Sequence, residues 1–236
     1  MSENEAGPAS RHLWLILGLA LLVRTLVWLP GGANPERFYT PDSFGYMELA
    51  GDLEAGYLDP QSHTFTLGLI RTPGYPFFLA AFLRLFQGSV RAVMAVQIGM
   101  SLVTVWLTYI LACRLIGRRT AVAGSLLLAL DPTSILFSCL IQPETLFTAL
   151  MVAGTLCWLL ALLGGRWRLA VGAGLLIGGA ALTRPIGLFL ALYLAAAVCM
   201  TRDIRPRTRL LICFLLASML PIGPNSKPSV ASVTPS

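Results

Sequence analysis

The sequence contains very little charge. Only 12% of its 236 residues are charged, against about 25% in soluble domains, and histidine occurs just twice. Lysine occurs once, at Lys227, so the net charge of +6 comes almost wholly from arginine. The mean hydropathy is +0.74. This composition excludes an ordinary soluble domain and favours a membrane protein.

Two further classes of site are excluded by spacing. The arginines stand in short clusters between apolar runs, which is the pattern of membrane topology and not of a basic groove, so we expect no nucleic-acid partner. The five cysteines lie mostly inside apolar runs and lack the spacing of a metal or redox motif. We interpret them as buried packing residues.

Long apolar runs predict an all-α membrane protein, since a transmembrane helix needs about 20 mostly apolar residues. The sequence predicts about seven transmembrane helices within a module spanning residues 13–223. The predicted spans are 13–30, 91–112, 120–138, 145–163, 169–183, 186–200 and 210–223. The flanking segments 1–12 and 224–236 are polar and are expected to be disordered.

The arginines also predict orientation. They precede the first predicted span and follow the second, fourth and sixth, so that 10 of the 17 basic residues fall on one side if the N-terminus is cytoplasmic. Residues 31–90 then form a long extracytoplasmic loop. The abundance of Ala, Gly, Leu and Arg over Lys is typical of a GC-rich bacterium, which predicts a bacterial inner (plasma) membrane.

The long first loop holds more than half of the acids and has its own helical pattern. Thr40 and Pro41 are a good helix start, and apolar residues recur at helical spacing from Tyr46 to Tyr57. Residues 77–86 form a second apolar stretch that is too short to span a membrane. We expect two amphipathic helices lying at the membrane interface.

Two acids are candidate catalytic residues. Asp42 in the first turn of its helix could serve as a general base, or it could simply stabilise the helix N-terminus. Glu144 has the same helix-start alternative, and could otherwise orient an acceptor or join Asp42 in binding a divalent cation.

Several cationic and aromatic residues are candidates for substrate binding. Arg184, embedded between apolar runs, could bind a phosphate, snorkel to the interface or pair with an acid, and Arg71 could bind phosphate from the loop. Tyr46, Tyr75 and the loop residue His63 are candidates for substrate contact, with packing, interface anchoring or no role as the alternatives.

Other polar or small residues in the spans have structural interpretations. Arg24 is expected to be structural, and Asp131-Pro132 indicates a break in the third span. Gly172, Gly174 and Gly178 superficially match a nucleotide-binding motif, but they lie inside a predicted span, which favours close helix packing.

Four segments together resemble the C-type membrane glycosyltransferases, in the bacterial branch related to protein O-mannosyltransferases and the lipid A aminoarabinose transferase. The segments are PDSFGYMELA, RTPGYPFFLA, LDPTSILFSCLIQPETLF and ALTRPIGL. The resemblance implies transfer of a sugar from a polyprenyl-phosphate donor to a lipid, glycan or protein acceptor outside the membrane. It also implies Asp42 and Glu144 at the catalytic centre, with Arg71 beside the donor phosphate and Arg184 near the same anionic site.

The sequence departs from this family in two places. Ser43 stands where many members carry a second acid, and the chain turns into a Ser/Pro/Val tail after residue 222 where members continue through further spans. We therefore expect a C-terminally truncated chain whose activity alone is in doubt. The main alternative is a transporter or channel, because membrane arginines and proline-broken helices also suit a permeation path. A non-catalytic membrane scaffold is the third interpretation.

Overall fold

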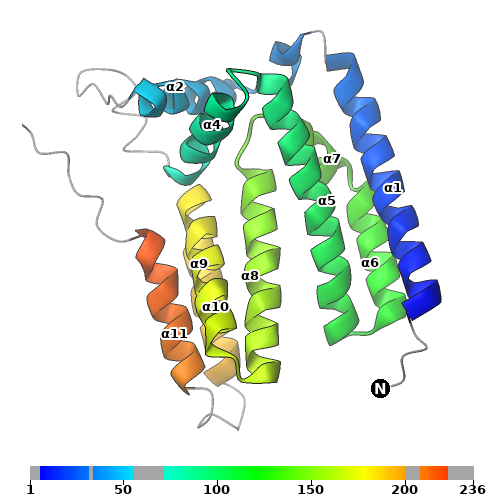
Figure 1. Cartoon of the computed structure of the whole chain (residues 1–236), viewed down its shortest axis with the longest axis vertical. Coiled ribbons are helices and arrows are strands. Elements are labelled where there is room, and N and C mark those ends of the chain that lie inside the picture. Colours follow the sequence, from blue (N-terminus) through cyan, green and yellow to red (C-terminus); the bar gives the residue numbers. More distant parts are fainter. Residues whose placement is uncertain (1–5, 32–33, 56–71, 200–207, 223–236) are drawn as a thin grey trace, which may run out of the picture.

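The computed structural model describes residues 6–31, 34–55, 72–199 and 208–222, and the secondary structure of these ranges is entirely helical. Most of the helices run side by side in a bundle (Figure 1). They are α1 (Ala6–Gly31), α5 (Val90–Leu115), α6 (Arg118–Leu130), α8 (Glu144–Gly164), α9 (Trp167–Thr183), α10 (Gly187–Cys199) and α11 (Thr208–Met219). The short elements are η2 (Pro35–Phe38), α7 (Pro132–Cys139) and η3 (Leu220–Ile222).

A helix lies at the position of each predicted span, but the count of seven spans is not confirmed. Among the described residues, α1, α5 and α8 are long and apolar enough to cross a membrane, and the pair α6–α7 makes a fourth span if it is counted as one. Helices α9, α10 and α11 have 17, 13 and 12 residues. At about 1.5 Å of rise per residue, these three fall short of the roughly 30 Å of a bilayer core.

The predicted break at Asp131-Pro132 is confirmed. Helices α6 and α7 meet there at a bend of 52°. Pro132 cannot donate a backbone hydrogen bond to continue α6, and the Asp131 side chain accepts a hydrogen bond from the Ser134 amide at 2.7 Å. The same residue therefore ends one helix and caps the next.

Helices α9 and α11 pack through small residues. A Cβ atom added at Gly174 would collide with the Phe214 carbonyl oxygen, and one added at Gly178 would collide with the Ser218 carbonyl oxygen. The predicted packing role is thus confirmed for these two glycines. Gly172, by contrast, has open space where its Cβ would be.

Arg24 is completely buried between α1, α5 and the α6–α7 bend. Its Nε donates to Ser101 Oγ at 2.9 Å and its Nη2 donates to Ser134 Oγ at 3.0 Å. Its Nη1 donates to the carbonyl oxygens of Ala129 at 2.9 Å and of Ala20 at 3.3 Å. Arg24 of α1 therefore ties α1 to α5, α6 and α7, as the structural interpretation predicted.

Helices α2 (Pro41–Ala55) and α4 (Gly74–Leu85) lie across the end of the bundle away from the N-terminus (Figure 1). Helix α2 begins at Pro41 as predicted, and the Thr40 amide donates to Ser43 Oγ at 2.9 Å. Leu49 and Ala50 of α2 are buried, and Ala50 belongs to the same apolar core as Tyr75 and Leu79 of α4. Placement of the two helices at a membrane interface stays a prediction.

Candidate functional site

The segment between α7 and α8 is held by hydrogen bonds from helices distant in sequence. Ser43 Oγ of α2 donates to the Ile141 carbonyl oxygen at 2.9 Å. Gln97 of α5 donates to the Leu140 carbonyl oxygen at 2.6 Å, and Gln142 Nε2 donates to Thr40 Oγ1 at 2.5 Å. The bonds of Ser43 and Thr40 fix the start of α2 beside Ile141 and Gln142, which lie three and two residues before Glu144.

The Glu144 carboxylate forms an ion pair with Arg184. Arg184 Nη1 donates to Glu144 Oε1 at 2.9 Å, with 19% of the Glu144 side chain and 46% of the Arg184 side chain exposed. Glu144 opens α8 and Arg184 closes α9. The acid thus meets the positive end of one helix dipole and the cation meets the negative end of the other.

The pairing follows from the antiparallel course of α8 and α9. Helix α8 ends at Gly165, whose φ of 64° is the left-handed conformation that glycine readily adopts. The chain then turns and α9 runs back along α8, so that the first residue of α8 and the residue after α9 reach the same end of the bundle (Figure 1).

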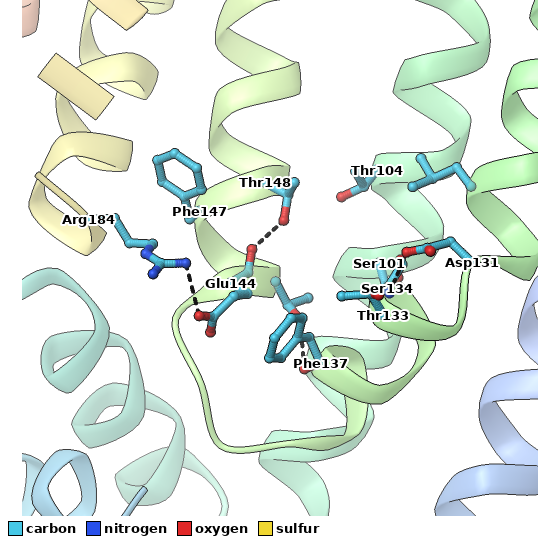
Figure 2. A pocket seen from close by; sticks show the side chains of 12 residues that line it. Ser101, Thr104, Asp131, Thr133, Ser134, Phe137, Glu144, Phe147, Thr148 and Arg184 are labelled. Carbon is cyan, nitrogen blue, oxygen red and sulfur yellow. Dashed lines mark hydrogen bonds and ion pairs between the residues drawn. The ribbon is translucent and has the colours of Figure 1, made fainter. Parts of the chain in front are cut away.

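A cavity of about 290 Å³ lies beside this ion pair, between α5, the α6–α7 bend and α8. Figure 2 shows Glu144 and Arg184 on one side and Asp131, Ser101 and Ser134 on the other. Hydroxyl groups dominate the polar lining, and two phenyl rings complete the wall. The lining residues used below are Ser101, Thr104, Asp131, Ser134, Phe137, Glu144, Thr145, Phe147, Thr148 and Arg184.

The remaining predicted site residues that the structure describes are not among those that line the cavity. Asp42 is exposed in the first turn of α2, at the end of the bundle that holds the ion pair. Tyr46 of α2 meets Tyr75 of α4 edge to face, with ring centroids 5.1 Å apart. Arg71 and His63 lie outside the described residues, so their predicted roles stay predictions.

Tyr75 is a packing residue in this structure. It is completely buried, and its hydroxyl donates to Gln97 Oε1 at 2.7 Å. Burial, and after it the Glu144 carboxylate, raise the pKa of the Tyr75 phenol well above its usual range. The phenol therefore stays protonated and supports Gln97, which in turn holds the segment before Glu144.

Among the described residues, no group of three or more His, Cys, Asp or Glu side chains is placed to hold a metal ion. The expected divalent cation would have used Asp42 and Glu144, and it stays a prediction. One carboxylate oxygen of the ion pair, Glu144 Oε2, is buried and has no hydrogen-bond partner among the described residues.

Sequence reasoning missed the hydroxyl lining of the cavity. Ser101 and Thr104 stand three positions apart in an apolar run, as do Thr145 and Thr148, and Asp131 was interpreted only as a break. Residues three apart share one face of a helix. Paired hydroxyls at this spacing in two separate spans were the available signal.

Comparison with known families decides the class. The family model for dolichyl-phosphate-mannose-protein mannosyltransferases matches residues 70–225. The chain belongs to this family. The match covers well over half of the chain and includes Glu144, Arg184 and the cavity, whereas Asp42 precedes it. No curated protein and no solved structure matches the chain.

Family membership confirms the resemblance to C-type membrane glycosyltransferases. It identifies the protein as a membrane glycosyltransferase of the type that uses a polyprenyl-phosphate sugar as its donor. A transporter or channel gains no support from this match. The bacterial branch and the orientation in the membrane stay predictions.

Proposed function

We propose that this protein transfers a sugar from a polyprenyl phosphate to a hydroxyl group of a lipid, glycan or protein acceptor at the outer face of a bacterial inner membrane. The observation that carries this proposal is the Glu144–Arg184 ion pair beside a hydroxyl-lined cavity, at the end of the bundle where α2 presents Asp42. Family membership supplies the donor class.

In the proposed reaction, Asp42 takes the proton of the acceptor hydroxyl. The acceptor oxygen bonds to the anomeric carbon as the bond from that carbon to the phosphate oxygen breaks. The bonding electrons leave with the polyprenyl phosphate, so that one displacement inverts the configuration of the sugar. The leaving phosphate gains negative charge in the transition state.

Arg184 is suited to stabilise that leaving phosphate. Only its Nη1 is bound to a described residue, and nearly half of the side chain is exposed. Glu144 holds the guanidinium in place while two of its nitrogens remain for phosphate oxygens. A cation placed in advance stabilises developing charge more than it stabilises the ground state.

A transfer assay tests this proposal. The purified chain is placed in proteoliposomes with radiolabelled polyprenyl-phosphate mannose and bacterial membrane extract as the acceptor source. We expect label to move to an acceptor in the wild type and in Asp52→Asn, a matched acid on α2, and transfer to be lost in Asp42→Asn. Normal transfer by Asp42→Asn would exclude Asp42 as the base. If the wild type releases no polyprenyl phosphate from any sugar carrier that is tested, the proposed function is contradicted.

A further inference from the structure

Three of the four threonines that line the cavity have already used their hydroxyl protons. Thr104 Oγ1 donates to the Met100 carbonyl oxygen and Thr145 Oγ1 to that of Phe137, both at 2.9 Å, and Thr148 Oγ1 donates to the Glu144 carbonyl oxygen. A hydroxyl that donates its proton to the backbone keeps only its lone pairs for a ligand. These three side chains can therefore act toward a ligand only as acceptors.

The two serines of the cavity, in contrast to these threonines, keep their hydroxyl protons available. Ser101 Oγ and Ser134 Oγ each accept a hydrogen bond from Arg24, at 2.9 and 3.0 Å. A guanidinium can only donate, so each serine oxygen must be the acceptor and must keep its own proton. Neither serine donates that proton to another described residue. Both line the cavity, where the proton is available to a ligand.

Arg24 is well fixed for this role. It is completely buried, and its Nη1 is held by the Ala129 and Ala20 carbonyl oxygens. Its Nε and Nη2 are consequently aimed at the two serines in one geometry. A hydroxyl that accepts from a cation is polarised, which makes it a stronger donor in turn.

These donors and acceptors match a sugar ring better than a phosphate. Ser101 and Ser134 are donors, while the acceptors are Thr104, Thr145, Thr148 and Glu144 Oε2, which has no hydrogen-bond partner among the described residues. A sugar hydroxyl both donates and accepts, and so can use both kinds of partner. A phosphate mainly accepts, and away from Arg184 at one side of this cavity it would face the carboxylates of Asp131 and Glu144.

The size and the aromatic walls agree with this ligand. A volume of about 290 Å³ lies just below the range of small-molecule pockets, about 300–1,000 Å³. It has room for one ring and not for a polyprenyl tail. Phe137 and Phe147 add apolar surface beside the polar groups.

We propose that this cavity binds the monosaccharide ring of the donor, and that Arg24 is a positioning residue that keeps Ser101 and Ser134 as hydrogen-bond donors to the ring's hydroxyl oxygens. The proposal rests on the proposed function, because a polyprenyl-phosphate sugar supplies the ring. It adds a sugar contact at Ser101 and Ser134, across the cavity from the phosphate contact at Arg184.

Two lipids that differ only in the sugar test the site. Dissociation constants of polyprenyl phosphate and of polyprenyl-phosphate mannose are measured on the full chain in lipid nanodiscs. We expect the mannose to tighten binding to the wild type about tenfold, in keeping with a few hydrogen bonds. In Ser101→Ala/Ser134→Ala this ratio should fall to near one, while affinity for polyprenyl phosphate is kept. Ser125→Ala, a buried serine outside the cavity, should keep the wild-type ratio.

A double-mutant cycle separates positioning from general support of the fold. Arg24→Lys keeps the charge, but one ammonium group cannot hold both serines. We therefore expect it to lower the ratio between the affinities for the two lipids and to leave the affinity for polyprenyl phosphate unchanged. Added to Ser101→Ala/Ser134→Ala, it should cause no further loss of that ratio. Equal weakening of both lipids by Arg24→Lys would show a merely structural residue. If this variant does not fold, the serine variants still decide the sugar site.

The outcomes distinguish the two proposals. Equal affinity of the wild type for both lipids, or a full mannose ratio in Ser101→Ala/Ser134→Ala, would overturn the sugar site and leave the donor class intact. Failure of the wild type to bind either lipid would contradict the proposed function and the sugar site with it.

Discussion

The Glu144 carboxylate and the Arg184 guanidinium, forty positions apart in the sequence, meet at 2.9 Å where α8 begins and α9 ends. The Arg184 side chain is 46% exposed and the Glu144 side chain 19% exposed, so solvent screens the pair and its contribution to stability is small. Exposed ion pairs contribute about 0.2–1 kcal/mol. Its importance is therefore expected in the reaction and not in folding.

Arg184→Gln should lower the transfer rate by roughly a hundredfold, the scale for loss of one preorganised group that stabilises transition-state charge. The thermal unfolding midpoint should barely change. Arg84→Gln, which removes an exposed arginine of α4 at the same end of the bundle, is the control and should transfer normally. An unchanged rate in Arg184→Gln would exclude this arginine from the phosphate site.

Ser43 explains a departure from the family pattern and yields a second prediction. Its buried hydroxyl donates to the Ile141 carbonyl oxygen, linking α2 to the segment before Glu144. An aspartate at position 43 would place a carboxylate oxygen next to the Ile141 carbonyl oxygen, and both atoms can only accept hydrogen bonds. Ser43→Asp should therefore destabilise the protein more than Ser43→Ala, for which loss of the hydrogen bond predicts about 1–3 kcal/mol.

The measurement is unfolding by denaturant in detergent, together with the transfer assay. We expect both Ser43 variants to slow transfer, because α2 carries Asp42 next to the displaced residue. Ser43→Asp that is as stable as the wild type and more active would contradict this assignment. It would favour the paired acids found in other family members.

Local features of the fold could be predicted from the sequence, because local chemistry decides them. Pro132 lacks the amide proton that would continue α6, and Pro41 suits the first position of α2. Glu144 was singled out as an acid at a helix start, and Arg184 as a charge between apolar runs. Their contact was left open, because it depends on the antiparallel course of α8 and α9.

The spacing of the cavity hydroxyls was visible in the sequence, but the role of each hydroxyl was not, for a related reason. A serine or threonine in an apolar helix usually bonds its own backbone, as Thr104 and Thr148 do here. Ser101 differs only because Arg24, 77 positions away, donates to it. The function of a hydroxyl is thus set by a partner that no local pattern reveals.

The α9–α11 contact predicts opposite effects for glycines of the same helix. Gly174→Ala and Gly178→Ala force a methyl group against the backbone of α11, and overpacking of this kind costs about 1–3 kcal/mol. Gly172→Ala meets open space, and should stabilise α9 by roughly 0.5–1 kcal/mol through helix propensity. Thermal unfolding in detergent compares the three. Equal effects at positions 172 and 174 would argue against close packing of α9 on α11.

The two ends of the bundle carry different residues, and labelling can assign them to compartments. Asp52 lies on α2 at one end and Arg166 lies in the turn between α8 and α9 at the other (Figure 1). In a chain whose native cysteines are replaced, a membrane-impermeant maleimide applied from outside should label Asp52→Cys and not Arg166→Cys. Permeabilised cells, in which both should react, are the control. The reverse pattern would put Asp42 and the cavity at the cytoplasmic face, where the proposed outer-face transfer could not take place.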